Sequence, residues 1–346
     1  MAKDFKNKIK RLELENFTCF GKVAMDFSPG INVIIGENGT GKTHLLKVLY
    51  ALSATTQPDI LFIEKIFKVF DKAALIKENF DSSHISFFMN GEHSTVQMKR
   101  EPVNYTDVFS EPSFVYINSN KLFLPTLEML SWFKGFISSY ENRESYVDET
   151  YYRLAKAIDP LSLKGDSLKK QLPLLKELEI AINATVVRKG DDFFISFKGS
   201  KKLQPAPLVA SGINKLAQLI WLIMNGSLTK DTILFWDEPE ANLNPKYILV
   251  VAKFLQTLAN AGCQIFVATH DYLLPYDLSL SAEYKKVSET PVPDMKFFSL
   301  FKGKSGTEVE EGATMPDLGH DAVHEGLTLH QDREDRLFQK SLNINP

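Results

Sequence analysis

The sequence predicts an α/β fold with a parallel central sheet. Two apolar runs, Ile31–Ile35 and Thr232–Trp236, each end in residues suited to a ligand site. The first run leads into a glycine-rich segment and then an apolar-periodic stretch, which is the pattern of a strand, a loop and a helix. Because open α/β sheets place their ligands at the carboxyl ends of buried strands, we expect the residues after both runs to contribute to one site.

The segment after the first run, residues 36–43, reads GENGTGKT and has the spacing of a phosphate-binding loop. Its glycines let consecutive backbone N–H groups turn onto phosphate oxygens, and the following helix adds the positive end of its dipole. Lys42 would reach the β- and γ-phosphates, and Thr43 would bind Mg²⁺. A glycine turn with an exposed lysine would leave the filling of every fixed position unexplained. The predicted nucleotide-binding residues here are Gly36, Glu37, Asn38, Gly39, Thr40, Gly41, Lys42, Thr43 and His44.

The long stretch between this loop and residue 211 is predicted to contain helices, short strands and a helical lobe. Prolines and glycines interrupt its middle, so no long heptad run can pass through it. Glu128 is expected to be an exposed acid in the first turn of a helix, where it favours the helix dipole. The predicted elements are helices at about 58–78, strands at 84–89, 94–99 and 113–117, a helical lobe at about 125–185, and a hairpin of Ala184–Arg188 and Asp192–Phe197.

The second apolar run ends in two adjacent carboxylates, Asp237 and Glu238. At the carboxyl end of a buried strand, Asp237 would hold Mg²⁺ through its ligand shell. Glu238 would orient and deprotonate the attacking water. The alternative is a strand that ends in solvated acids. The phosphate loop upstream favours the first interpretation.

The C-terminal part is predicted to contain a strand at Asp294–Phe301, a turn at Gly303–Gly306 and a charged helix at Asp321–Lys340. We expect residues 1–285 to form one head domain with the helical lobe inserted in it. Residues 286–346 would be an extension packed on this head and a possible docking surface for a partner.

The composition predicts a protein of the cytoplasm. With 346 residues and 44% hydrophobic content, the chain can bury a substantial core. Its two cysteines, Cys19 and Cys263, provide no disulfide framework. The N-terminus lacks the apolar region of a signal peptide, and the longest apolar stretch, Leu216–Met224, is too short to span a bilayer, so we expect no membrane association. A net charge of −3 gives no global reason to bind nucleic acid, although local basic clusters leave DNA binding open.

The order of the motifs resembles the ABC-type ATPase heads of the SMC, RecF and OLD-like branch. The chain is similar above all to stand-alone ATPases of bacterial anti-phage systems, of the Septu type and of the retron-associated type. The resemblance covers most of the chain from about Ile9 to Ala282. It rests on the phosphate loop, a helix start at Ala210–Lys215, the strand before Asp237 and Glu238, the turn Pro239–Pro245, and the strand Gln264–Ala268 with Thr269 and His270 after it.

The resemblance implies an ABC-type P-loop NTPase with a mixed or parallel central sheet, an antiparallel β subdomain and a helical lobe. It also implies ATP and Mg²⁺ as cofactors. Ser211 and Gly212 match the signature motif, which in this family contacts the γ-phosphate bound by the opposite subunit. Asn244 matches the D-loop, and His270 matches the switch histidine that senses the γ-phosphate. His270 would thus join Lys42 and Glu238 as a catalytic residue.

The sequence departs from the family pattern in the signature motif and the D-loop. Ile213 stands where many members have a second glycine, Asn214 where the SMC branch has glutamate, and Asn244 where transporters usually have aspartate. These departures predict a looser grip on nucleotide and slow turnover. Asn118 and Asn120 are the nearest candidates for the family's glutamine loop, although an ordinary turn at a strand end fits equally well.

The function that the resemblance implies is an ATP-driven head-to-tail homodimer, or a larger homo-oligomer, that controls a separate effector in anti-phage defence. The effector would be a nuclease, such as an HNH or Toprim protein, or a retron component. The alternative is an ATP-dependent DNA clamp of the RecF kind. A third possibility, the ATPase subunit of a transporter, fits poorly with the long insertion before residue 211.

Overall fold

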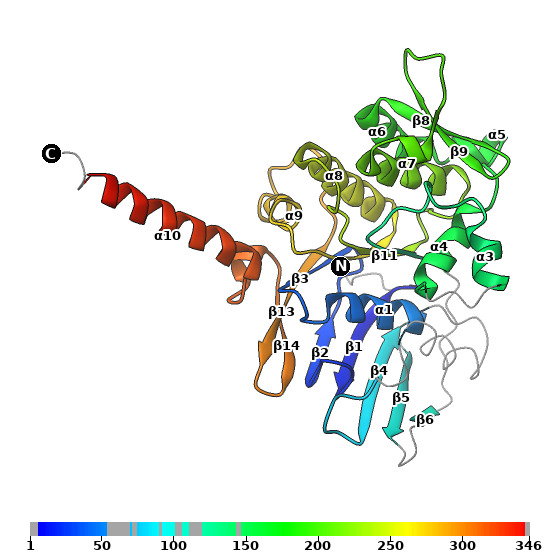
Figure 1. The fold of residues 1–346 in the computed structure, drawn as a ribbon. Coiled ribbons are helices and arrows are strands. Elements are labelled where there is room, and N and C mark those ends of the chain that lie inside the picture. The colour runs from blue at the N-terminus through cyan, green and yellow to red at the C-terminus, as the bar shows by residue number, and fades with distance from the viewer. Residues whose placement is uncertain are drawn as a thin grey trace.

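The computed structural model of the protein describes residues 6–53, 70, 75–89, 92–100, 106–110, 120–142 and 147–342. These residues form the predicted α/β architecture (Figure 1). A central sheet carries helices on both faces, an antiparallel sheet lies below it in the view of Figure 1, and a helical lobe lies above it.

The central sheet has the strand order β14-β13-β3-β12-β11-β7 within the described residues. Its five strands from β13 to β7 are parallel, and β14 pairs antiparallel with β13. The sheet is therefore mixed, and the carboxyl ends of β3, β12 and β11 lie at one edge. The strands are β3 (Ile31–Gly36), β7 (Lys121–Leu124), β11 (Ile233–Asp237), β12 (Gln264–Ala268), β13 (Met295–Gly303) and β14 (Gly306–Gly312).

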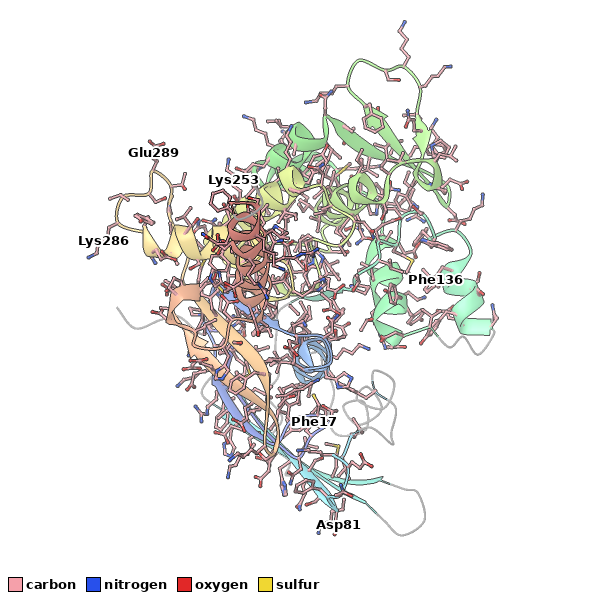
Figure 2. The ribbon with its side chains drawn as sticks, turned by 60° about the vertical axis from the view of Figure 1, so that its left-hand side comes forward. Phe17, Asp81, Phe136, Lys253, Lys286 and Glu289 are labelled. Atoms are coloured by element: carbon pink, nitrogen blue, oxygen red, sulfur yellow. The ribbon has the colours of Figure 1, made fainter. Side chains whose placement is uncertain are left out.

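Helix α1 (Lys42–Ser53) follows the phosphate loop and lies between the central sheet and the antiparallel sheet (Figure 1). One apolar cluster joins all three layers and includes Ile34 of β3, Leu45 of α1 and Leu12 of β1. Figure 2 shows Phe17, another member of this cluster, next to α1. The antiparallel sheet has the order β2-β1-β4-β5-β6, with β1 (Ile9–Glu15), β2 (Lys22–Asp26), β4 (Ser82–Met89), β5 (Glu92–Arg100) and β6 (Thr106–Ser110).

The other face of the central sheet packs against the helical part of the molecule through a second apolar cluster. In this cluster Val33 and Ile35 of β3 point away from α1, as the period-2 geometry of a strand requires. The helices are α3 (Phe136–Asn142), α4 (Glu149–Ile158), α5 (Gly165–Lys169), α6 (Leu172–Ile182), α7 (Ser211–Met224), α8 (Pro245–Ala261) and α9 (Leu273–Glu283). A three-stranded sheet, β8 (Ala184–Lys189), β9 (Asp192–Phe197) and β10 (Gln204–Pro205), leads to α7, and short 3-10 helices lie at Ala206–Leu208 and Met315–Asp317.

Most predicted elements that fall on described residues are confirmed, including the hairpin β8–β9 and the strands β4 and β5. The strand predicted at 113–117 lies outside the described residues. The helix predicted at about 58–78 also lies mostly outside them, and its described end is not helical, because Ile76 forms a β-bridge with Phe17.

The prediction for Glu128 is wrong. No helix contains this residue, and its side chain is buried rather than exposed. One carboxylate oxygen accepts a hydrogen bond from the backbone N–H of Ser131 (3.1 Å). Helices of the lobe begin only at Phe136, because the chain first turns away from the end of β7.

The C-terminal part contains the predicted strand, as β13, and the predicted helix, as α10 (Ala322–Leu342). Strand β13 pairs with β3 and therefore lies in the central sheet, directly beside the strand that carries the phosphate loop. A division of the chain at residue 285 remains a prediction, and it would separate two neighbouring strands of one sheet. No helix in the described part of the chain is long and apolar enough to cross a bilayer.

Candidate functional site

The phosphate loop is held tightly against its surroundings at two of its glycines. A Cβ atom on Gly36 would lie 2.4 Å from the carbonyl oxygen of Leu300 in β13, and one on Gly41 would lie 2.3 Å from Sγ of Cys19. Both glycines have positive φ angles, +149° and +94°. Only glycine therefore fits these two positions without strain.

The side chain of Lys42 lies against the first residues of the phosphate loop. Its Nζ donates hydrogen bonds to the carbonyl oxygens of Gly36 (2.7 Å) and Glu37 (3.0 Å). Burial lowers the pKa of the Lys42 ammonium, and the nearby acids Glu238 and Asp237 oppose that effect. A cation is thus held at the centre of the loop, where the predicted phosphate contacts would form.

Thr43 and Asp237 meet between the two half-sites. Oγ1 of Thr43 donates a hydrogen bond to Oδ2 of Asp237 at 2.8 Å. Burial raises the pKa of the Asp237 carboxyl, and the hydrogen bond from Thr43 partly opposes this rise. Adjacent ligands of an octahedral Mg²⁺ lie about 2.9 Å apart, since each bond to oxygen is about 2.0–2.1 Å long. The spacing of these two oxygens therefore fits a shared Mg²⁺ ion.

Glu238 and His270 form a second pair at the same edge of the sheet. Oε1 of Glu238 lies 3.1 Å from Nδ1 of His270, and both side chains are partly exposed. Glu238 has a φ angle of +48°, which is unusual for a residue with a side chain, and its N–H donates to the carbonyl oxygen of Ala268 (2.9 Å). Because Ala268 ends β12, this bond fixes the predicted base beside the predicted switch histidine.

Glu240 is a buried member of the site that the sequence analysis did not identify. Its Oε1 accepts hydrogen bonds from Oγ1 of Thr269 (2.8 Å) and from the backbone N–H of His270 (3.3 Å). Its Oε2 is buried and has no hydrogen-bond partner among the described residues, and burial raises the pKa of the carboxyl. The sequence signal that could have identified Glu240 is its position as a charged residue between Pro239 and Ala241, in the turn after the predicted strand.

Lys215 is a second buried residue that the analysis missed. It lies on α7, and its Nζ donates to the carbonyl oxygens of Glu238 (2.9 Å) and Pro239 (3.3 Å). Burial lowers the pKa of Lys215 to about 8, although Glu240 and other acids of the site oppose this shift. Lys215 thus connects α7, the helix that begins with the signature motif, to the segment that follows β11. The sequence signal that could have identified Lys215 is its position directly before the apolar run of α7.

The signature residues lie at the start of α7. Ser211 is exposed, and the preceding residue, Ala210, provides no side-chain cap for the helix. Gly212 is buried, and a Cβ atom there would lie 2.5 Å from the carbonyl oxygen of Asn242. Asn214 is also buried, and its Nδ2 donates to the carbonyl oxygen of Ala206 (2.7 Å), so this side chain has a structural role.

Asn244 and His44 have other contacts than the predicted ones. Oδ1 of Asn244 accepts from the backbone N–H of Lys246 (3.0 Å) and caps α8. The ring of His44 packs edge to face against Phe70, and its buried Nδ1 has no hydrogen-bond partner in the part of the chain that the structure describes. In the described part of the chain, no hydrogen bond joins Ser211 or Asn244 to residues 36–44 of the same copy.

The assignment of Asn120 as a candidate for the glutamine loop is wrong. It lies at the amino end of β7, where its carbonyl oxygen accepts from the N–H of Ile233 (2.8 Å). The ligand edge of the sheet is at the other end of β7, after Leu124, where Glu128 follows. Asn118 lies outside the described residues. The sequence analysis placed a strand before Asn120, at 113–117, and did not identify β7 after it, because a strand of four residues is too short to be recognised by its pattern.

Two protein-family models match the chain. Residues 8–172 match the family described as "AAA ATPase domain". Residues 111–275 match the family described as "AAA domain, putative AbiEii toxin, Type IV TA system". The two matches overlap and together span the phosphate loop and the acidic strand.

Among curated proteins the chain is similar to DNA replication and repair protein RecF. The RecF of Staphylococcus haemolyticus (strain JCSC1435) is 26% identical over 182 residues, which is 50% of this chain and 45% of RecF. The RecF of Streptococcus uberis (strain ATCC BAA-854 / 0140J) is 51% identical over 47 residues, or 14% of this chain and 13% of RecF. The chain thus covers less than half the length of these relatives.

Among solved structures the chain is similar to SMC heads. An SMC head bound to the C-terminal winged-helix domain of ScpA has a TM-score of 0.56 and 12% identity, over 89% of this chain and 98% of that one. A second head, with an extended coiled coil and bound to the C-terminal domain of ScpA derived from Pyrococcus furiosus, has a TM-score of 0.51 and 13% identity, over 94% and 99%. At this level of identity the likeness establishes the fold. The chain thus has the fold of SMC heads, and its sequence is similar to ATPase domains and to part of RecF.

Proposed function

We propose that the protein is an ATP-driven switch in which two copies associate head to tail. Each phosphate loop would hold one ATP, and Ser211 of the partner subunit would close over its γ-phosphate. The hydrogen bond between Thr43 and Asp237 carries this proposal, because it supports a nucleotide and Mg²⁺ site already formed within one copy.

The charge of the nucleotide explains why a second copy is needed. ATP carries several negative charges, and the loop offers one lysine, Lys42, to balance them. The start of α7 has an exposed Ser211 and no side-chain cap, so its backbone N–H groups and its helix dipole are available to an anion. A helix start supplied by the partner would add the missing stabilisation.

The side chains of the site divide the chemical work of hydrolysis. Mg²⁺ held by Thr43 and Asp237 would offset the charge of the phosphates. Lys42 would leave its carbonyl contacts and bind the β- and γ-phosphates. Glu238 would take the proton of the attacking water, and His270, which lies 3.1 Å from Glu238, would sense the γ-phosphate. The contact between copies would then weaken when the γ-phosphate is lost.

We propose that this dimer controls a separate effector in anti-phage defence, either a nuclease of the HNH or Toprim class or a retron component. The support is the resemblance of the motif order to stand-alone defence ATPases. The similarity to RecF favours a second candidate, an ATP-dependent clamp on DNA. These two functions make the same use of ATP and differ in what the closed dimer holds.

The dimer is tested by light scattering with three variants. Glu238→Gln should keep ATP binding, slow hydrolysis by roughly 10²–10⁴-fold and gain mass when ATP and Mg²⁺ are added. Ser211→Arg should bind ATP without this gain in mass, and Lys42→Ala should not bind ATP. A Glu238→Gln protein that binds ATP and Mg²⁺ but whose mass stays constant would refute the proposal.

The effector is tested by isolating tagged Glu238→Gln from its native cells with ATP and Mg²⁺. A nuclease or reverse transcriptase that is enriched over a Lys42→Ala control would support effector control. If only the protein itself returns, together with DNA protected from added nuclease, the clamp takes its place. Duplex binding by a clamp should require ATP and fall steeply with salt, because contacts to phosphates release counterions.

A further inference from the structure

Within the described part of the chain, helix α10 is anchored to the head at its start alone. Asp321 caps the helix, since its Oδ1 accepts from the backbone N–H groups of Val323 and His324, both at 3.0 Å. Its Oδ2 accepts a hydrogen bond from the hydroxyl of Tyr276 in α9 (2.6 Å). Val323 packs against the apolar cluster on the helical side of the central sheet. The first turn is thus fixed in place.

Beyond its first turn α10 has no packing partner among the residues that the structure describes. Figure 1 shows it projecting away from the head, and Figure 2 looks almost along it. Every residue from His324 to Ser341 is exposed, and four of them are large apolar side chains, namely Leu327, Leu329, Leu337 and Phe338. A single helix in water is marginally stable, and most helices in proteins are stabilised by packing of an apolar face. The exposed part of α10 therefore needs a partner.

One face of α10 has the same pattern in both chain directions. Leu327, Gln331, Glu334 and Phe338 follow one another at spacings of four, three and four residues, which places them in one line along the helix. The midpoint of this line lies between Asp332 and Arg333. If two copies of α10 pack antiparallel about that midpoint, Leu327 faces Phe338 of the partner subunit, and Gln331 faces Glu334 of the partner subunit.

The charges of this face favour the antiparallel arrangement. In it the carboxylate of Glu334 lies beside the amide of the partner's Gln331 and the imidazole of the partner's His330, both of which can donate hydrogen bonds to it. A parallel arrangement would instead place Glu334 opposite Glu334 of the partner subunit, and like charges in that position are destabilising. A second copy of this chain is thus a complementary occupant for the face.

We propose that α10 pairs with α10 of a second copy as an antiparallel, two-fold symmetric helix pair. This interface is independent of ATP and goes beyond the head-to-tail dimer proposed above. A helix of this length extends about 30 Å, so antiparallel pairing holds the two heads at opposite ends of the pair. The pairing leaves the phosphate loop and Ser211 free, and ATP would join such pairs into larger assemblies.

The first test is the mass of the nucleotide-free Lys42→Ala protein by sedimentation and light scattering. We expect a dimer, and we expect the added pair of changes Leu327→Ser and Phe338→Ser to halve the mass. Leu329→Ser is the matched control, because Leu329 is 60% exposed but points to the opposite side of the helix from Leu327, which is 38% exposed. All these residues are exposed, so the thermal unfolding of the head should not change. A monomer before substitution, or a dimer that survives both serines, overturns the proposal.

The second test is the direction of pairing. Leu327→Cys and Phe338→Cys proteins should form a disulfide when they are mixed under mild oxidation. Neither should cross-link alone, because like positions lie about 16 Å apart along the antiparallel pair. The parent protein, which has Cys19 and Cys263, is the control. Cross-linking of Leu327→Cys with itself, or none in the mixture, overturns the antiparallel arrangement, and neither result bears on the ATP-driven dimer.

Discussion

The close packing of Gly41 gives a prediction that compares two glycines of the phosphate loop. A Cβ atom on Gly41 would lie 2.3 Å from Sγ of Cys19 and 3.0 Å from Cζ of Phe20. A Cβ atom on Gly39 would meet no atom within 4 Å. Both glycines have positive φ angles, +94° and +80°, so alanine is conformationally strained at each of them. Alanine at either position therefore carries the cost of backbone strain, and alanine at Gly41 carries in addition the cost of a steric clash.

The expected losses follow from these two costs. Left-handed backbone costs an alanine about 1–2 kcal/mol, which is the whole expected loss for Gly39→Ala. Overpacking adds about 1–3 kcal/mol, so Gly41→Ala should lose about 2–5 kcal/mol of the free energy of unfolding. Cys19→Ala removes the atom that clashes most. The double variant Cys19→Ala, Gly41→Ala should therefore be more stable, by about 1–2 kcal/mol in the free energy of unfolding, than the sum of the two single changes predicts.

The assay is urea unfolding of the nucleotide-free protein, followed by tryptophan fluorescence, for the four variants and the parent. The difference between Gly41→Ala and Gly39→Ala isolates the steric effect, and the double-variant cycle assigns it to Cys19. Equal losses for the two glycine substitutions would refute the reasoning. Strict additivity of Cys19→Ala and Gly41→Ala would show that the sulfur is not the obstacle.

Two further predictions concern the buried polar residues of the site. The folded-state pKa of Lys215, about 8, lies below its ordinary value of 10.5, so the unfolded chain binds more protons between these values. Burial of Lys215 therefore costs most below pH 8, and stability should rise with pH from 8 to 10.5. Lys215→Met should lack this rise in urea titrations at several pH values, and equal slopes would contradict the assignment. Glu240→Ala should lower kcat about tenfold with little change in ATP affinity, because the loop of His270 loses two hydrogen bonds. Glu240→Gln keeps an acceptor at this position and should retain most of the activity, so equally slow Gln and Ala variants would argue against a positioning role.

The parts of the site that could be predicted are those encoded in consecutive residues. The phosphate loop has its strand, its turn and its helix in one segment, and the structure confirms them as β3 and α1. The acidic strand is confirmed as β11 in the same way. The assignment of Thr43 and Asp237 to one Mg²⁺ ion also led to the expectation that they are neighbours, and a hydrogen bond joins them.

The parts that could not be predicted depend on packing between distant segments. The burial of Glu128 follows from the pairing of β7 with β11, and a strand of four residues is too short to be recognised by its pattern. The roles of Lys215 and Glu240 require their partners to be known, because an isolated charged residue in a sequence is usually exposed. The position of β13 beside β3 is likewise a long-range pairing, which apolar patterns do not specify.

The pairing of β3 has a consequence for how the protein is made. Strand β3 pairs only with β12 and β13 among the described strands, and the contact between Asn32 and Ile265 spans 233 residues of chain. During synthesis β3 leaves the ribosome before both of its neighbours and stays unpaired until they emerge, since pairings of large sequence separation form late. We expect a nascent chain that stops before β13 to expose an unpaired apolar strand and to have no rigid phosphate loop. ATP would then bind, and stabilise the fold, only after β13 has emerged.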